Sequence, residues 1–412
     1  MNSRARYIVL LTAFLGWYFA GIEMSLMPLA ARTVAQDLLG SDFTEAAAGK
    51  WLNYFNGALL LGAAIGGMIF GWVGDRAGRV RAMGLSILCY SGFTGAGYFI
   101  RTPEEMAALR FLAGLGVGGM WPCAVSLVSE FWSSVSRPMM AGILGSSANF
   151  GYVSVGVMGS WIHVTPESWR WLMLVGAAPV LLGVFALLAV PESPAWLAAR
   201  AAPTAQKRPA PVAEVFRPPL LRLTLLGIVL GAIPLLGAWS SGKFLVPWAD
   251  SIVGASDPGF KARTQMWWGS GAVLGSLIGG QVANLLGRRR AYFLISLGAF
   301  LINGGIYRFA NPADGGFLPM VFALGFVSTI FFGWLPLYLP ELFPTRVRAT
   351  GTGVSYNFGR FATAAGVFMA GALMSAFGGN YAQVGAITSL VYGLGMIAIW
   401  FAPDTTGKGL KD

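Results

Sequence analysis

Apolar residues recur along the whole chain in blocks of about 20, and short stretches of polar, glycine and proline residues separate these blocks. A block of that length, folded as an α-helix, crosses the hydrocarbon core of a bilayer. The pattern therefore predicts an all-α membrane protein with twelve transmembrane helices. These helices are expected near residues 7–31, 51–73, 80–100, 106–129, 138–162, 169–190, 221–249, 264–286, 291–309, 317–340, 350–377 and 381–402.

The basic residues are distributed unevenly between the two sides of these predicted helices. An even number of spans places both termini on one side, and the termini and loops of that side hold 18 of the 28 lysine and arginine residues, against 7 in the opposite loops. Lysine and arginine concentrate in cytoplasmic loops. We therefore expect a multi-pass protein of the cell (inner) membrane with both termini in the cytoplasm.

The composition narrows the class of protein further. Hydrophobic residues make up 56% of the chain and charged residues 11%, whereas roughly a quarter of an ordinary soluble domain is charged. The net charge of +11 comes from basic residues in short loops, so membrane topology accounts for it and no nucleic-acid partner is expected. The sequence contains no recognisable nucleophile and base pair, metal-ligand cluster or nucleotide loop, so we expect no enzyme, no catalytic or metal site and no cofactor.

Three short segments recur in the second half of the chain at nearly one spacing. "GWVGDRAGR" at 71–79 matches "GQVANLLGR" at 280–288, "SEFWSSVSR" at 129–137 matches "PELFPTRVR" at 340–348, and "PESPAWL" faces "PDTTGKG" near the end of each half. A duplicated bundle binds its substrate between the halves, near the middle of the membrane. We expect a six-helix bundle at 1–197, a cytoplasmic linker at 198–220 and a second six-helix bundle at 221–412.

These segments resemble the major facilitator superfamily of transporters, over essentially the whole chain. The segment 71–79 is similar to its signature loop between helices two and three. "RFLAGLGVGG" from Arg110, "PESPAWL" and "PELFPTRVRATGTG" resemble the branch that contains sugar/proton symporters, organic-acid/proton symporters and organic-ion transporters. The resemblance implies twelve helices and transport by alternating access. The chain departs from the family pattern at Asn284, a position of the second signature loop at which members of the family often have an acid.

The resemblance also implies a charged gate on the cytoplasmic face. Paired charges at a water-accessible seam form in one state and separate in the other. Acids contribute little to membrane topology, whereas the basic residues among the candidates have topology as an alternative explanation. The expected gate residues are Asp75, Arg76, Arg79, Glu130 and Arg137 in the first half, and Arg288, Glu341 and Arg348 in the second.

Four ionisable residues, Glu23, Arg110, Lys243 and Arg360, lie well inside predicted spans, where a charge is costly and marks a functional candidate. Glu23 and Arg110 both fall in the outer half of the membrane, so they can be partners. In the branch that the chain resembles, sugar/proton symporters use such a pair for proton coupling. Because residue 20 is Ala20 and not an acid, Glu23 has no second acid in this turn of the helix. Burial favours the neutral carboxyl and the guanidinium favours the carboxylate, so moving either partner changes proton binding. The alternative is a fixed structural ion pair.

The remaining interior cations are the candidate anion-binding groups. Arg360 matches by position the arginine that organic-anion transporters use, and Tyr356 lies on the same helical stripe. Lys243 follows Ser240 and Ser241 in a weakened, broken helix seven; the alternative is that it extends to the membrane surface. Trp239, in the same segment as Lys243, is a further candidate. Weaker candidates, for which ordinary interhelical contacts are the alternative, complete the predicted substrate site: Asn53, Asn56, Trp121 and Asn149.

The interior charge indicates the substrate class. Three bases against one acid leave a positive surplus, which suits an anion and repels an organic cation. We therefore expect proton-coupled uptake of a small organic anion, such as a monocarboxylate, sugar acid or aromatic acid, by a monomer in the bilayer, with protons as the coupling ion. The alternatives are a neutral sugar/proton symporter and a signalling receptor on a transporter scaffold.

Overall fold

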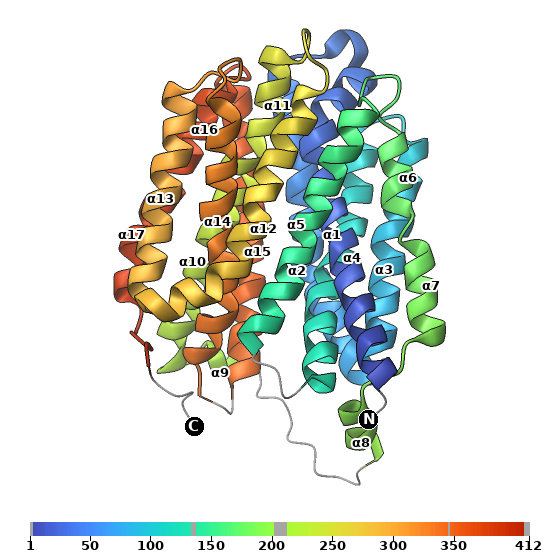
Figure 1. Cartoon of the computed structure of the whole chain (residues 1–412), viewed down its shortest axis with the longest axis vertical. Helices are drawn as coiled ribbons and strands as arrows, with labels where there is room; N and C mark the ends of the chain where they lie inside the picture. Colours follow the sequence, from blue (N-terminus) through green and yellow to red (C-terminus); the bar gives the residue numbers. More distant parts are fainter. Residues whose placement is uncertain (1–2, 133–136, 202–211, 345–346, 408–412) are drawn as a thin grey trace.

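The computed structural model describes residues 3–132, 137–201, 212–344 and 347–407 of the chain (Figure 1). All regular structure in these ranges is helical, which confirms the predicted all-α class. The first half contains α1 (Ser3–Leu39), η1 (Gly40–Asp42), α2 (Glu45–Ala77), α3 (Arg79–Ala96), η2 (Gly97–Phe99), α4 (Pro103–Phe131), α5 (Arg137–Trp161), α6 (Trp171–Ala177) and α7 (Val180–Ala189).

The second half repeats this architecture after two short helices, α8 (Pro194–Ala201) and α9 (Val212–Val215). Nine of the described helical stretches are long and apolar enough to cross a membrane. The helices of the second half are α10 (Leu220–Trp239), α11 (Ser241–Val253), α12 (Phe260–Leu286), α13 (Arg288–Phe309), α14 (Phe317–Glu341), α15 (Arg348–Ala376), α16 (Tyr381–Ser389), α17 (Val391–Ala398) and η3 (Ile399–Phe401).

Three of the predicted helices are interrupted. The predicted helix at 169–190 is divided into α6 and α7, and that at 381–402 into α16 and α17 followed by η3. The break predicted in helix seven is confirmed at Ser240, which separates α10 from α11. Because the Ser240 hydroxyl and the Ser241 hydroxyl donate back to carbonyls four residues earlier, they compete with the helix for its own hydrogen bonds there.

The helices form two groups that lie side by side (Figure 1). Helices α1 to α7 make one group and α10 to α17 the other; α2 packs against α15, and α5 against α12, across the boundary. The chain enters α1 and leaves η3 at the same end of the molecule, which we call the near end; the opposite end is the far end. A seam between the two groups therefore runs from the near end to the far end.

Within the first group, helices approach each other too closely for larger side chains. A Cβ atom on Gly66 of α2 would lie 1.9 Å from the Leu115 carbonyl oxygen of α4, and one on Gly118 of α4 would lie 2.0 Å from the Ala63 oxygen of α2. Small residues permit this close backbone approach between transmembrane helices. Helices α2 and α4 are thereby packed closely together, and α2 also contacts α15 across the seam.

Candidate functional site between the two halves

Glu23 of α1 and Arg110 of α4 form a buried ion pair within the first half. Glu23 is 0% exposed and Arg110 is 2% exposed. The Glu23 Oε2 atom lies 3.3 Å from Arg110 Nη1 and accepts a hydrogen bond of 2.6 Å from the Thr94 hydroxyl of α3. Glu23 Oε1 has no hydrogen-bond partner. The carboxyl group therefore has one oxygen held by a cation and a hydroxyl, and one oxygen free to take a proton.

The backbone of α1 is also held at this level. Pro28 lies inside α1 and has no N–H group, so the carbonyl of Met24, four residues earlier, has no helical donor. The Tyr152 hydroxyl of α5 donates to that oxygen at 2.9 Å. Arg110 Nη2 donates to the neighbouring Glu23 carbonyl at 2.8 Å. Two adjacent carbonyl groups of α1 are thus fixed by side chains of two other helices.

Lys243 of α11 approaches the same place from the second half. Its ammonium group donates a hydrogen bond to the Tyr152 hydroxyl and lies 3.6, 4.6 and 5.3 Å from the ring centres of Tyr152, Trp268 and Trp239. The side chain is 5% exposed. Lys243 therefore points into the protein among aromatic rings and does not extend to the membrane surface, the alternative considered for it.

Arg360 of α15 lies elsewhere along the seam. It is buried, its Nη1 donates to the Ala63 carbonyl of α2 at 3.3 Å, and its guanidinium lies 4.8 Å from the Tyr356 ring centre. Tyr356 and Arg360 lie on the same face of α15, as the sequence predicts. Among the described residues, no carboxylate forms an ion pair with Arg360 or Lys243. No acid among the described residues thus neutralises either buried cation, which makes both of them candidates to bind an anion.

The weaker candidates divide into two groups. Asn53 and Asn56 of α2 are buried; Asn53 donates to the Gly49 carbonyl, its oxygen has no partner, and neither polar atom of the Asn56 amide has one. The other two form packing contacts: Asn149 donates to the α12 carbonyl of Ala272, and Trp121 lies against the Trp17 ring. The structure places Asn149 and Trp121 in interhelical contacts, which was the alternative for both.

The near end holds two charge clusters, one in each half. Arg79 pairs with Asp75 and lies 3.7 Å from Glu130, whereas Arg288 pairs with Glu341 at 2.8 Å. Asn284 occupies the position of Asp75 in the repeat, and its amide oxygen accepts from Arg288 at 2.9 Å. The departure at Asn284 therefore replaces a charged acceptor with a neutral one and does not remove the second cluster.

The remaining predicted gate residues are Arg76, Arg348 and Arg137. Arg76 is exposed and its guanidinium lies 4.4 Å from the Trp72 ring centre. Arg348 donates to the Phe343 carbonyl at 3.3 Å. Arg137 begins α5, and its side chain lies outside the described residues.

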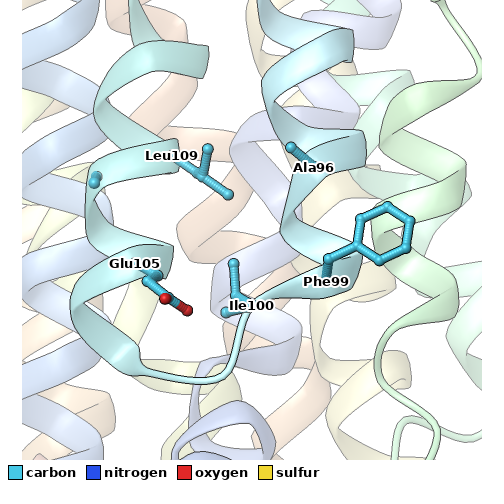
Figure 2. Close-up of a pocket in the computed structure, with 6 residues that line it drawn as sticks. Ala96, Phe99, Ile100, Glu105 and Leu109 are labelled. Atoms are coloured by element: carbon cyan, nitrogen blue, oxygen red, sulfur yellow. The ribbon is translucent and has the colours of Figure 1, made fainter.

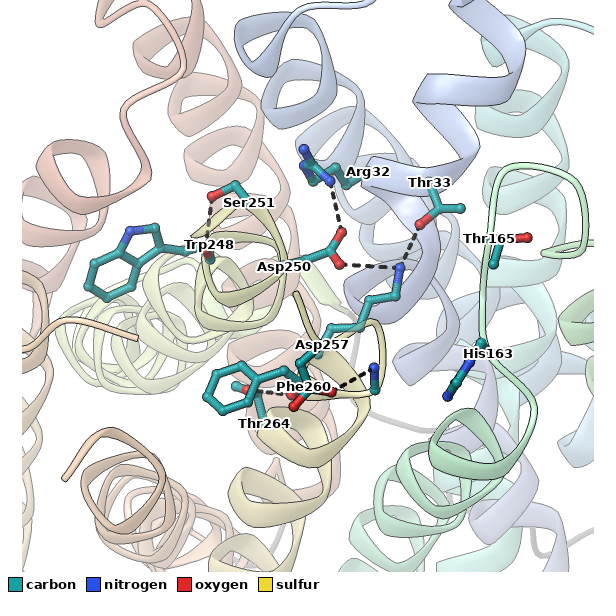
Figure 3. A network of polar contacts seen from close by, with 12 residues as sticks. Arg32, Thr33, His163, Thr165, Trp248, Asp250, Ser251, Asp257, Phe260 and Thr264 are labelled. Carbon is teal, nitrogen blue, oxygen red and sulfur yellow. Dashed lines mark hydrogen bonds and ion pairs between the residues drawn. The ribbon is translucent and has the colours of Figure 1, made fainter. Parts of the chain in front are cut away.

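The far end contains a polar cluster that joins the two halves (Figure 3). Arg32 of α1 lies 2.6 Å from Glu45 of α2 and 3.1 Å from Asp250 of α11. Lys261 of α12 lies 3.4 Å from Asp250 and donates to the Thr33 hydroxyl of α1 at 2.8 Å. Two contacts within the halves and two contacts between them thus close the seam at this end.

A hollow on the surface between α3 and α4 is no candidate for the substrate site (Figure 2). Its lining is apolar apart from Glu105. The Glu105 carboxylate accepts from the backbone N–H groups of Arg101 and Thr102 and so caps the start of α4. This hollow contains no group to bind an anion.

Sequence reasoning missed the uncharged members of the site. Thr94, Tyr152, Gln265 and Trp268 lie in spans where polar or aromatic residues are common, and neither spacing nor charge distinguishes them. Tyr152 lies one turn after Asn149, on the same face of α5 as that predicted residue. Their roles depend on how the helices are rotated, which a hydrophobic pattern does not specify.

Comparison with known proteins supports a transport role. The family profile described as Major Facilitator Superfamily matches residues 7–367. The cis,cis-muconate transport protein of Acinetobacter baylyi is 28% identical over 370 residues, covering 88% of this chain and 86% of the relative. The gallate transporter of Pseudomonas putida is 25% identical and covers 90% and 86%.

A solved structure of the Escherichia coli xylose transporter XylE, in a partially occluded inward-open conformation, has a TM-score of 0.74 at 18% identity, covering 99% of this chain and 100% of that one. At this identity the likeness establishes the fold alone. Because the family and these relatives are transporters, the protein is a transporter and not an enzyme. The family match spans most of the sequence, so the chain belongs to the Major Facilitator Superfamily.

Proposed function

We propose that the protein takes up a small organic anion together with protons by alternating access. The observation that supports this most directly is the buried pair of Glu23 and Arg110, in a molecule that holds two further buried cations, Lys243 and Arg360, with no acidic partner among the described residues. Buried charges in a membrane protein are costly and mark ion or substrate pathways. The relatives named for muconate and gallate transport agree with an anionic substrate.

The coupling follows from the chemistry of the pair. Arg110 favours the ionised carboxylate, whereas burial favours the neutral carboxyl, so the proton affinity of Glu23 depends on how closely Arg110 is held. A proton enters at the free Glu23 Oε1 atom, and an anion attracted by Lys243 and Arg360 enters the seam. The far end then closes, the near end opens toward the cytoplasm, and both solutes leave inward.

Transport in proteoliposomes tests this proposal. Labelled benzoate and cis,cis-muconate are offered with and without an acidic exterior, and accumulation above equilibrium is expected only with the pH gradient. Glu23→Gln removes the titratable group and should abolish that accumulation while exchange of internal for external anion continues. Unchanged accumulation by Glu23→Gln would show that Glu23 does not couple transport to protons.

A neutral sugar is the second candidate. The buried Asn53 Oδ1 atom and both polar atoms of the Asn56 amide have no hydrogen-bond partner, and amides suit hydroxyl groups. Competition of unlabelled sugars and acids against the labelled acid separates the two. An anion carrier is inhibited by acids alone, and Arg360→Ala should weaken uptake of its preferred acid. Inhibition by sugars with no effect of Arg360→Ala would favour the sugar.

A further inference from the structure

Resting on the proposed function, we propose that Lys243 is the anion subsite that acts on the Glu23–Arg110 pair, and that the Tyr152 hydroxyl connects the two. Arg360 contributes affinity at another level of the seam. This assigns different roles to the two unpaired cations and a positioning role to Tyr152, which neither charge nor the repeat pattern of the sequence indicates.

The groups around Lys243 suit a carboxylate attached to a flat, unsaturated body, and the cavity beside them, about 10 Å³ in this structure, must widen to admit one. The ammonium group has the Tyr152 hydroxyl as its hydrogen-bond acceptor and three ring faces around it. The small pocket beside it is lined by Gln265 and Trp268, whose Oε1 and Nε1 atoms are buried and have no hydrogen-bond partner. A carboxylate would neutralise the ammonium and accept from the indole N–H group, and a planar body would stack on the rings.

The connection to the proton site consists of hydrogen bonds. Lys243 donates to the Tyr152 hydroxyl, which donates to the Met24 carbonyl; Arg110 holds the next carbonyl, that of Glu23. The Met24 carbonyl depends on Tyr152 because Pro28 provides no N–H group. A carboxylate that accepts from both Lys243 and Tyr152 leaves this carbonyl without a donor. Helix α1 must then readjust at the residue beside Glu23.

Arg360 has no such connection. Its described contacts are the Ala63 carbonyl and the Tyr356 ring. A Cβ atom on Gly67 would lie 3.4 Å from the Gly118 carbonyl and 3.6 Å from Arg360 Nη1, which places Arg360 near the level of Gly118. Gly118 follows Arg110 by two helical turns on α4, about 12 Å along the axis at 1.5 Å per residue. An anion on Arg360 therefore lies away from the coupling pair.

The chain offers a matched control for the Tyr152 hydroxyl. Pro234 of α10 leaves the Leu230 carbonyl without its helical donor, and the buried Tyr292 hydroxyl donates to that carbonyl at 2.9 Å. Tyr292→Phe and Tyr152→Phe therefore remove the same hydrogen bond to a carbonyl freed by proline. No lysine of the described ranges contacts the Tyr292 hydroxyl.

The experiment compares exchange with gradient-driven accumulation of labelled benzoate and cis,cis-muconate in proteoliposomes. Tyr152→Phe should retain exchange but lose about tenfold in accumulation, the factor that a typical coupling free energy gives. Tyr292→Phe should lower thermal stability and leave the accumulation ratio unchanged. Full accumulation by Tyr152→Phe would overturn the inference.

A second pair of variants keeps the test decisive if Tyr152→Phe does not fold. Lys243→Met and Arg360→Met each remove one cation and should each raise KM. The residual transport by Arg360→Met should still follow the pH gradient, whereas that by Lys243→Met should not. Equal dependence on the gradient in both variants would refute the inference. A wild type that accumulates neither acid would instead refute the proposed function itself.

Discussion

At the scale of single residues, the environment of Glu23 leaves very little space. The carboxyl is fully buried, Thr94 donates to one oxygen, and Gly176 of α6 lies against the other. A Cβ atom on Gly176 would lie 2.4 Å from Thr94 Cγ2 and 2.8 Å from Glu23 Oε1. The glycine is therefore needed for the position of both side chains, and not for its backbone conformation.

Gly176→Ala should consequently disturb both stability and coupling. Overpacking of this kind costs about 1–3 kcal/mol, and the displaced Thr94 hydroxyl should weaken accumulation of labelled acid under a pH gradient. Thermal unfolding followed by tryptophan fluorescence and the accumulation assay measure the two effects. Gly92→Ala is the control, because a Cβ atom on Gly92 of α3 meets nothing within 4 Å. Equal behaviour of the two variants would contradict this account.

At the scale of helices, the two near-end clusters are repeats that differ in burial. Gly78 and Gly287 precede α3 and α13 with φ values of 115° and 81°, in the region that glycine favours, so the arginine that follows each turns back toward its cluster. The side chains of Arg79 and Glu130 are 21% and 23% exposed, whereas those of Arg288 and Glu341 are 9% and 10% exposed. The two clusters should therefore differ in strength.

Neutralising the acid should show this difference. Glu341→Gln leaves the buried Arg288 guanidinium without its carboxylate, which costs about 3 kcal/mol or more. Glu130→Gln breaks a longer, partly solvated pair and should cost about 1 kcal/mol or less. Thermal unfolding of the purified variants in detergent compares them directly. A larger loss for Glu130→Gln would mean that burial does not determine the strength of these clusters.

The hydrophobic blocks and the sequence repeats predicted many of the helices and several residues of the near-end charge clusters. The apolar runs located the helices, and the repeated loops identified Arg79, Glu130, Arg288 and Glu341. The helix ends were predicted less well, because α1 continues to Leu39, eight residues beyond the predicted end at 31. Capping and packing, not hydrophobicity, determine where a helix ends.

The misplaced helix ends also concealed the polar cluster at the far end. Arg32 and Lys261 were assigned to loops because each lies just outside an apolar block, whereas both belong to helices, α1 and α12, that face the seam. Tyr152 and Thr94 were missed for a related reason, since the rotation of one helix against another depends on side-chain packing over the whole bundle. A charge inside a predicted span identified Glu23 and Arg110 in the sequence, whereas their neutral partners Thr94 and Tyr152 became evident only in the structure.

At the scale of the whole molecule, the far-end cluster connects the two halves whereas the near-end clusters each lie within one half. Asp250 is the acid that meets both Arg32 of the first half and Lys261 of the second. The one described ion pair between the halves, Arg32–Asp250, thus lies at the far end of the seam. Such contacts favour the conformation that is closed there.

Asp250→Asn should shift the population toward a conformation open at the far end. A loss of about 1.4 kcal/mol changes the ratio of the two conformations tenfold. Spin labels on Asp42→Cys and Ser256→Cys, in a chain without Cys89 and Cys123, report the distance across the seam, and longer distances should become more populated.

Asp37→Asn is the control for this measurement. Asp37 pairs with Arg170 at 2.8 Å at the same end but within the first half, so its removal makes the same change of charge without affecting a contact between the halves. Its distance distribution should match that of the wild type. An Asp250→Asn distribution that also matches the wild type would show that the cluster does not bias the conformation.

The composition of this far-end cluster also determines what remains after it separates. When the halves separate, Arg32 remains paired with Glu45 and Lys261 remains paired with Asp250, so each side of the opening holds an electrically neutral pair. Separation exposes no lone charge to water or to the approaching solute. These four side chains therefore add no net charge at the entrance, and they leave discrimination between solutes to the groups deeper inside.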